Sequence, residues 1–179
     1  LVNDLVLKWQ GIIRHLWHNG ELPRLEKIQR PVILEIGAGY GGMAHHFMTM
    51  FPGAIYIIVD IPETLLFSAS YLTLIHGQER VHLLDQDTEV ASGSLGGCSF
   101  LMVPNFLLPS LSSWHFDLAM NMNSFQEMTE KQVTEYLEFL APRTDVLYSK
   151  NIDEFEFSSD KVAVTPLLRQ FFDLKVLTP

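Results

Sequence analysis

A glycine-rich segment between two apolar stretches most constrains the fold of this chain. It reads Leu34-Glu35-Ile36-Gly37-Ala38-Gly39-Tyr40-Gly41-Gly42, after the β-branched run 32–36 and before apolar residues at helical spacing over 43–51. Short β-branched runs that end in glycine are typical of buried parallel strands. Glycines here allow backbone angles that a Cβ disfavours, and the next helix presents unpaired N–H groups to an anion. The segment therefore predicts a strand, a loop and a helix that together bind an anionic or polar ligand.

The rest of the chain repeats this alternation of strand and helix. A second apolar run, 55–60, ends in Asp60, and Pro62 favours the first turn of the helix that follows it. Further strands are expected at 81–84, 100–103, 116–121, 145–149 and 174–177, and further helices after Thr129 and from Thr165 through Phe172. Strands and helices that alternate with short connections predict a parallel sheet. The expected fold class is α/β and Rossmann-like, with a mostly parallel central sheet and helices on both faces.

The length of 179 residues fits one main domain. We divide the chain into an N-terminal helical segment, 1–29, and a nucleoside-binding domain, 30–179. Three roles are open for the first helix, which carries Trp9 and Trp17: covering the ligand pocket, packing on the sheet, or joining copies of a homo-oligomer. The chain starts without methionine inside helical periodicity, which suggests a fragment of a longer protein.

Charge and cysteine content narrow the class of partner. The formal net charge is -9, so a nucleic-acid backbone would be repelled, and no nucleic-acid partner is expected. No apolar run approaches the roughly 18 residues of a membrane span, and no signal peptide begins the chain, so no membrane partner is expected. The single cysteine, Cys98, cannot form an internal disulfide, which favours the reducing cytoplasm.

Asp60 complements the glycine segment. A carboxylate at the end of the second strand can accept hydrogen bonds from ribose hydroxyls, so the two features together describe an adenosine-type site. Gly37, Gly39 and Gly42 also match the dinucleotide pattern G-x-G-x-x-G. Glu35 argues against a dinucleotide, because its carboxylate would oppose a pyrophosphate but could accept a hydrogen bond from an α-ammonium group. The remaining interpretation of the glycine-rich segment is a tight turn that binds no ligand.

At these residues the chain resembles the class I S-adenosylmethionine-dependent methyltransferases, whose first motif is an acid followed by G-x-G-x-G. Within them, the segments 34–42, 59–64 and 123–128 resemble the bacterial sugar O-methyltransferase family. The resemblance covers about residues 30–151. It implies a class I methyltransferase fold with S-adenosyl-L-methionine as cofactor and a small sugar-type molecule as acceptor. That fold normally closes with an antiparallel hairpin, which the short C-terminal part of this chain leaves shortened.

The resemblance also assigns roles to residues. Those that would hold the methionine end are Glu35, Gly37, Ala38 and Gly39. Asp60 would hold the ribose, with Ile61 beside the adenine. Asn105, followed by Phe106, would contact the adenine amino group, with Asp85 as an alternative, and Asn121 would lie near the transferred methyl group.

Methyl transfer to a hydroxyl requires an aligned acceptor and a base that removes its proton. Glu127, just beyond the strand expected at 116–121, is the leading candidate for this base, although it could instead stabilise the first turn of the next helix. His46 is the second candidate and His45 the third, and these neighbours diverge by about 100° on a helix. No set of metal ligands is evident, because histidines at chelating spacing are absent and Asp117 is expected to begin a strand.

Two other functions are consistent with the pattern. One is an NAD(P)-dependent oxidoreductase that uses the same glycine loop. The other is a non-catalytic module that keeps the nucleoside pocket for binding or assembly.

Overall fold

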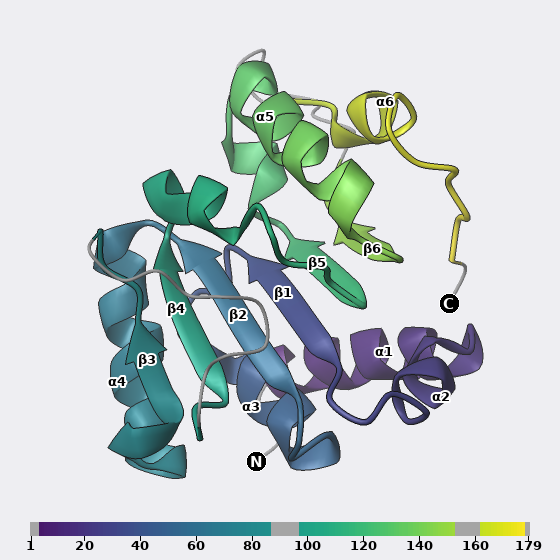
Figure 1. Ribbon diagram of the computed structural model, residues 1–179. Helices are drawn as coiled ribbons and strands as arrows, with labels where there is room; N and C mark the ends of the chain where they lie inside the picture. The colour runs from purple at the N-terminus through teal and green to yellow at the C-terminus, as the bar shows by residue number, and fades with distance from the viewer. Residues whose placement is uncertain (1–3, 87–96, 153–161, 178–179) are drawn as a thin grey trace.

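A computed structural model describes residues 4–86, 97–152 and 162–177 of the chain (Figure 1). The strands are β1 (Val32–Ile36), β2 (Ile55–Asp60), β3 (Val81–Leu83), β4 (Phe100–Pro104), β5 (Leu118–Met122) and β6 (Leu147–Lys150). The α-helices are α1 (Asp4–His18), α2 (Glu21–Leu25), α3 (Gly42–Met50), α4 (Pro62–His76), α5 (Glu130–Leu140) and α6 (Val164–Leu168). Short 3-10 helices are η1 (Gln78–Arg80), η2 (Asn105–Leu111), η3 (Phe125–Glu127) and η4 (Ala141–Arg143).

The strands form one sheet in the order β3-β4-β2-β1-β5-β6, and every ladder between them is parallel. β1 lies in the middle, and the chain moves to one side of it for β2 and to the other side for β5. A reversal of this kind is the topological switch point of doubly wound sheets, where ligands bind beyond the carboxyl ends of the strands. The predicted Rossmann-like α/β fold is confirmed.

Helices cover both faces of the sheet (Figure 1). On one face α1, α2, α3 and α4 pack on a cluster that includes Ile33, Tyr56 and Met120. On the other face α5, α6 and η2 pack on a cluster that includes Leu34 and Ile57. Successive strand residues point to opposite faces, so the continuous apolar runs of β1 and β2 serve both clusters. The N-terminal segment and the sheet therefore share one hydrophobic cluster.

Local sequence signals account for the elements around the site. Met43, Phe47 and Met48 of α3 are buried, as their helical spacing predicts. At the start of α5, the Thr129 hydroxyl accepts a hydrogen bond from the Gln132 backbone N–H, and the Gln132 side chain accepts one from the Thr129 N–H. This reciprocal cap is the predicted capping box. Asp117 precedes β5, and its carboxylate accepts a hydrogen bond from the Val32 N–H at the start of β1.

The C-terminal prediction is wrong in two respects. The last helix ends at Leu168 rather than Phe172, and residues 174–177 form no ladder with the sheet. Val176 is exposed, so the apolar spacing there does not correspond to a buried strand face. The sheet ends at β6 within the described part of the chain, without an antiparallel hairpin. No helix among the described residues combines the length and apolar character needed to cross a bilayer.

Candidate nucleoside site at the glycine loop

The glycine loop joins the carboxyl end of β1 to the N-terminus of α3. Gly37, Gly39 and Gly41 all have positive φ, at 74°, 58° and 86°. A residue with a Cβ adopts these angles at a cost of about 1–2 kcal/mol, so glycine favours this tight turn. The Gly37 N–H donates to the Val59 carbonyl near the end of β2, which holds the loop against that strand, and the Gly41 N–H donates to the Ala38 carbonyl within the loop.

The glycines differ in what lies opposite them. A Cβ on Gly37 would meet the Cβ and Oγ of Ser124 at 2.3 Å, and one on Gly42 would meet the ring of Trp9 at 2.2 Å. A Cβ on Gly41 would touch side chains of α4, whereas one on Gly39 would meet nothing within 4 Å. A ligand can therefore approach the loop at Gly39. The space opposite Gly37 holds a side chain, and its assignment to cofactor binding stays a prediction.

Asp60 lies beside the open glycine. Its Oδ2 accepts a hydrogen bond from the Gly39 N–H at 3.2 Å, and its Oδ1 accepts one from the Ile61 N–H at 2.8 Å. Partial burial raises the pKa of Asp60, while hydrogen bonds from the backbone N–H groups of Ile61, Gly39 and Ala38 act in the opposite direction. A carboxylate has about four acceptor positions, so Asp60 can bind the loop and still accept bonds from a diol. The predicted pairing of Asp60 with the glycine loop is thus present, and the neighbouring Ile61 is exposed.

Glu35 lies in the interior rather than at the open edge. Its side chain is 1% exposed and accepts a hydrogen bond from the Tyr56 hydroxyl at 2.7 Å. Burial raises its pKa from 4.5 to about 7, the Tyr56 bond lowers it, and the charge of Asp60 raises it. Contact with an α-ammonium group would require this carboxylate to become accessible. Because the carboxylate faces Tyr56, Glu35 no longer argues against a pyrophosphate at the loop, contrary to the expectation from sequence.

Asn121, expected near the reacting methyl group, is fully buried at the end of β5. Its Nδ2 donates to the Ile36 carbonyl at 3.1 Å and is bonded to the Ser124 hydroxyl, and its Oδ1 accepts from the Phe125 N–H and the Asn151 side chain. Both ends of the amide are therefore satisfied by the protein. Asn121 ties the end of β1 to the loop after β5, and contact with a cofactor stays a prediction.

Asn151 and Gln126 extend this network, which sequence reasoning missed. Asn151 Nδ2 donates to Asn121 Oδ1 at 2.9 Å, and Gln126 Oε1 accepts from the Ile152 N–H at 2.7 Å. The signal that could have revealed it is the presence of amide side chains after two adjacent parallel strands. The carboxyl ends of adjacent parallel strands meet at one edge of a sheet.

The residues after β4 lie one strand beyond Asp60. Asp60 pairs with Pro104 in the sheet, and Asn105 and Phe106 follow directly in η2. Asn105 is half-buried and Phe106 is exposed. The alternative residue, Asp85, follows β3, which is one strand farther from β2. Strand order therefore favours Asn105 over Asp85 as a neighbour of a ligand held by Asp60.

The two candidate bases come from elements on opposite faces of the sheet. Glu127 is exposed in η3 beyond β5. His46 lies on α3 with its ring 5.3 Å from that of Trp9, and burial, followed by the charge of His45, lowers its pKa. The His45 ring instead contacts His76, with 3.0 Å between Nδ1 and Nε2. The two neighbouring histidines diverge as expected, and the structure does not bring His46 and Glu127 together.

Tyr136 of α5 is a further residue near the site. Burial and the charge of Asp60 raise its pKa to about 12, and its ring lies 5.8 Å from that of Phe125. Helical spacing places Tyr136 only on the apolar face of its helix. Nothing in the periodicity could show that this phenol shares the electrostatic environment of Asp60, because the two residues lie on different elements.

Trp9 fixes α1 against the glycine loop. Its ring lies 5.6 Å from that of Tyr40, which packs edge-on against Tyr71 at 5.1 Å. Ile12 and Leu16 are buried on the same face of the sheet. Of the three roles considered for the first helix, packing on the sheet is therefore observed, with Trp9 placed over the N-terminus of α3.

Gly42→Ala is expected to destabilise the protein by about 2 kcal/mol, because the new methyl group overlaps the Trp9 ring and α1 must shift. In a Trp9→Ala background the same substitution should be neutral or stabilising by up to about 1 kcal/mol, since alanine favours a helix over glycine. Urea unfolding of the four proteins in this cycle measures the difference. Equal costs in the two backgrounds would show that Trp9 does not occupy this position.

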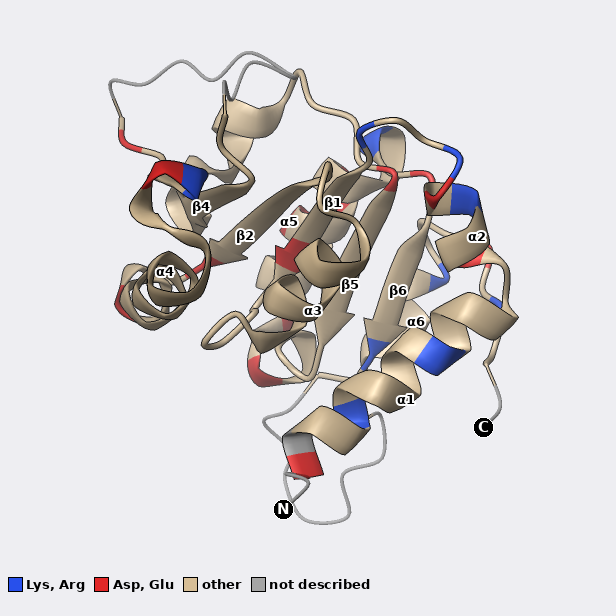
Figure 2. Ribbon diagram, turned by 90° about the horizontal axis from the view of Figure 1, so that it is seen from below, with Lys and Arg blue, Asp and Glu red and all other residues tan. Residues whose placement is uncertain are grey.

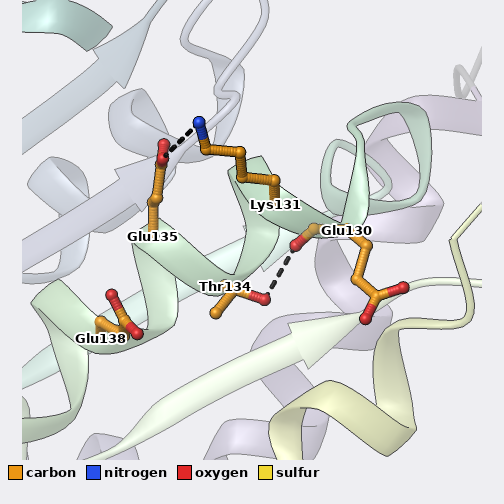
Figure 3. A pocket seen from close by; sticks show the side chains of 5 residues that line it. All are labelled: Glu130, Lys131, Thr134, Glu135 and Glu138. Atoms are coloured by element: carbon orange, nitrogen blue, oxygen red, sulfur yellow. Dashed lines mark hydrogen bonds and ion pairs between the residues drawn. The ribbon is translucent and has the colours of Figure 1, made fainter.

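Two other features of the described residues do not contribute to the site. A shallow pocket is lined by Glu130, Lys131, Thr134, Glu135 and Glu138, all on the outer side of α5 (Figure 3). Its side chains interact along the helix, with Lys131 and Glu135 3.7 Å apart. In the described ranges no three His, Cys, Asp or Glu side chains are grouped so that they could hold a metal ion.

No protein-family profile and no curated protein matches the chain. Among solved structures it is similar to the mitomycin 7-O-methyltransferase MmcR, with 14% identity over 73% of this chain and 34% of that protein and a TM-score of 0.49. It is also similar to PigF with SAH, with 15% identity, 66% and 31% coverage and a TM-score of 0.48. A complex of LepI with SAM gives 13% identity, 81% and 33% coverage and a TM-score of 0.45. The chain spans about a third of the length of these proteins.

The strand order and the open loop at the switch point define a Rossmann-like α/β protein. Its glycine loop and the acid after β2 meet at the edge of the sheet where this class of protein binds its ligands.

Proposed function

We propose that this chain is the cofactor-binding part of an S-adenosylmethionine-dependent methyltransferase that acts on a hydroxyl of a sugar or a related polar small molecule. The observation that carries the proposal is the Glu-x-Gly-x-Gly loop whose open glycine, Gly39, donates its N–H to Asp60 at the carboxyl edge of the sheet. The sugar acceptor rests on the resemblance of residues 59–64 and 123–128 to sugar O-methyltransferases.

Each part of the cofactor has candidate partners in the chain. Asp60 would accept hydrogen bonds from the ribose, and Ile61 and Asn105 would flank the adenine. Gly39 would allow the methionine part to approach the loop backbone, where no side chain intervenes. When bound, S-adenosylmethionine supplies an electrophilic methyl group on its sulfonium.

The acceptor hydroxyl must lose a proton, and two groups could take it. Glu127 is exposed beyond β5, at the edge where the strands end. Burial lowers the pKa of His46, which favours the neutral ring that can accept a proton. The net charge of -9 favours a small polar acceptor over a nucleic acid.

Calorimetric titration with S-adenosylmethionine, S-adenosylhomocysteine and NAD tests the cofactor. We expect binding of the first two ligands and none of NAD. Because Glu35 is buried against Tyr56, the dinucleotide alternative needs this direct comparison. Binding of NAD without S-adenosylmethionine would overturn the proposal in favour of an oxidoreductase.

A methyl-transfer screen on sugar nucleotides and glycosides tests catalysis. Loss of a general base typically slows a reaction by about 10²–10⁴-fold, so we expect such a loss in either Glu127→Gln or His46→Ala, with cofactor affinity retained. The non-catalytic alternative is favoured by Asn121, whose polar atoms already have protein partners. Cofactor binding without turnover on any acceptor would support that alternative.

Asp60→Asn is expected to weaken S-adenosylmethionine binding by about 10–100-fold, because it removes charge-assisted hydrogen bonds to the ribose. Asp173→Asn, an exposed acid in the C-terminal segment, is the matched control and should leave the affinity unchanged. Calorimetry of both variants, with circular dichroism to confirm folding, measures the effect. An unchanged affinity in Asp60→Asn would place the ribose elsewhere.

A further inference from the structure

α4 has an apolar outer face that the rest of the described chain does not cover. The helix buries Leu65, Ser68 and Leu72 against the sheet. On the remaining surface Leu66 is 68% exposed, Phe67 69%, Leu74 86% and Ile75 46%. A helix that is apolar all round is normally buried on all sides, so α4 lacks a partner on its outer side among the described residues.

The exposed residues form one stripe. At 100° per residue, Leu66, Ser70, Leu74 and Phe67 fall within an arc of about 100°, and Ile75 lies about 80° beyond Phe67. α4 lies at the β3 edge of the sheet, with its outer side facing away from the molecule (Figures 1 and 2). α4 carries one acidic residue, Glu63 in its first turn, and one basic residue, His76 in its last turn.

The stripe has the size of an interface core. At roughly 150–200 Å² for a free large apolar side chain, Leu66, Phe67, Leu74 and Ile75 present on the order of 450 Å². A standard protein interface buries about 800 Å² per partner, of which slightly more than half is apolar. The outer face of α4 therefore matches the apolar part of a stable interface.

We propose that this face joins two copies of the chain into a dimer in which the two α4 helices pack antiparallel about a twofold axis at Ser70. In this arrangement Leu66 of each copy faces Leu74 of the other, which makes the surface self-complementary, as a twofold interface requires. The small Ser70 at the centre allows the helices to approach to about 8–10 Å.

Charge is compatible with this pairing. The chain carries a net charge of -9, so most surfaces of two copies repel each other. The stripe carries one charged residue, Glu63, which falls on the same arc at its N-terminal end, and the antiparallel arrangement places the two Glu63 carboxylates at opposite ends of the interface. Each then lies away from its own counterpart, near the C-terminal end of the other helix, where the helix dipole makes a small unfavourable contribution.

Sedimentation equilibrium of the whole chain up to about 100 µM tests the assembly. We expect a dimer for the native chain and a dissociation constant raised by about 100-fold or more for Leu74→Glu, since two buried leucines are lost per dimer. Val176→Glu is the matched control, because Val176 is 82% exposed in the C-terminal segment beyond the opposite edge of the sheet, and it should dimerise like the native chain (Figure 1). A native chain that stays monomeric, or a dimer that Leu74→Glu leaves intact, would overturn the proposal.

Cross-linking tests the register. In a Cys98→Ser background, oxidation of Ser70→Cys should join the two copies through a disulfide across the axis, whereas Ser113→Cys should not. Ser113 is exposed after η2, which packs on the other face of the sheet. A chain that dimerises without cross-linking through position 70 would overturn this arrangement of the helices.

Discussion

Between pH 4 and pH 8, the free energy of unfolding of the native chain is expected to fall by about 3 kcal/mol relative to that of Glu35→Gln. The Glu35 carboxyl titrates near its ordinary pKa of 4.5 when the chain is unfolded and at about 7 in the folded protein, where it is buried. Between these values the folded state keeps a proton that the unfolded state has lost. A pKa difference of this size corresponds to about 3 kcal/mol.

The sign follows from the direction of this shift. A carboxyl with a raised folded pKa stabilises the folded state most at low pH, and that stabilisation is lost as pH rises through about 7. The neutral amide that Glu35→Gln introduces can still accept the Tyr56 hydrogen bond but does not ionise. The free energy of unfolding of this variant should therefore rise relative to that of the native chain as pH increases, whatever constant offset the amide itself introduces.

Urea unfolding of both proteins at several pH values between 4 and 8 measures this effect. Glu138→Gln, an exposed acid on α5, is the control and should follow the native pH dependence. Parallel curves for the native chain and Glu35→Gln would contradict the buried position of Glu35.

The second large effect concerns two glycines of the same loop. Gly37→Ala is expected to destabilise the protein by about 3 kcal/mol and Gly39→Ala by only about 1 kcal/mol. Both residues have positive φ, at 74° and 58°, so both substitutions carry the cost of a left-handed residue, about 1–2 kcal/mol. Only the methyl group on position 37 meets Ser124, at 2.3 Å, so Gly37→Ala also incurs overpacking.

Ser124 explains why this overlap has no easy relief. Its hydroxyl donates to the Ile36 carbonyl at 3.0 Å and is bonded to Asn121, so moving it disturbs the link between β1 and β5. In a Ser124→Gly background, Gly37→Ala should cost about as much as Gly39→Ala. Urea unfolding measures all of these variants, and equal costs for the two single substitutions would show that Ser124 is not packed on Gly37.

Gly37→Ala and Gly39→Ala also distinguish an effect on folding from an effect on ligand binding. Gly39 is the open glycine, so Gly39→Ala should fold yet place a methyl group where a ligand approaches the loop. If the proposed cofactor binds there, calorimetry should show a loss of affinity larger than the loss of stability. Unchanged affinity in Gly39→Ala would move the cofactor away from this residue.

Much of the architecture could be predicted because its signals are local. The β-branched runs, Pro62 at the start of α4 and the Thr129–Gln132 capping box each depend on neighbouring residues alone. Parallel strands also end at a common edge, so the proximity of Asp60 and the glycine loop followed from the order of the elements. The strand predicted at 174–177 failed because a strand also needs a neighbour to pair with, and local apolar spacing carries no information about one.

By itself the sequence determined the α/β class, the order of strands and helices, and the loop with its acid as the place to look for a ligand. Only the tertiary structure decided that Gly39 is open while Ser124 and Trp9 cover Gly37 and Gly42. It also decided that Glu35 is buried against Tyr56, that protein partners surround Asn121, and that the outer face of α4 is uncovered by the described residues. The physical reason is that burial and hydrogen bonding depend on residues far apart in the chain, whereas glycine spacing and helix caps depend on neighbours.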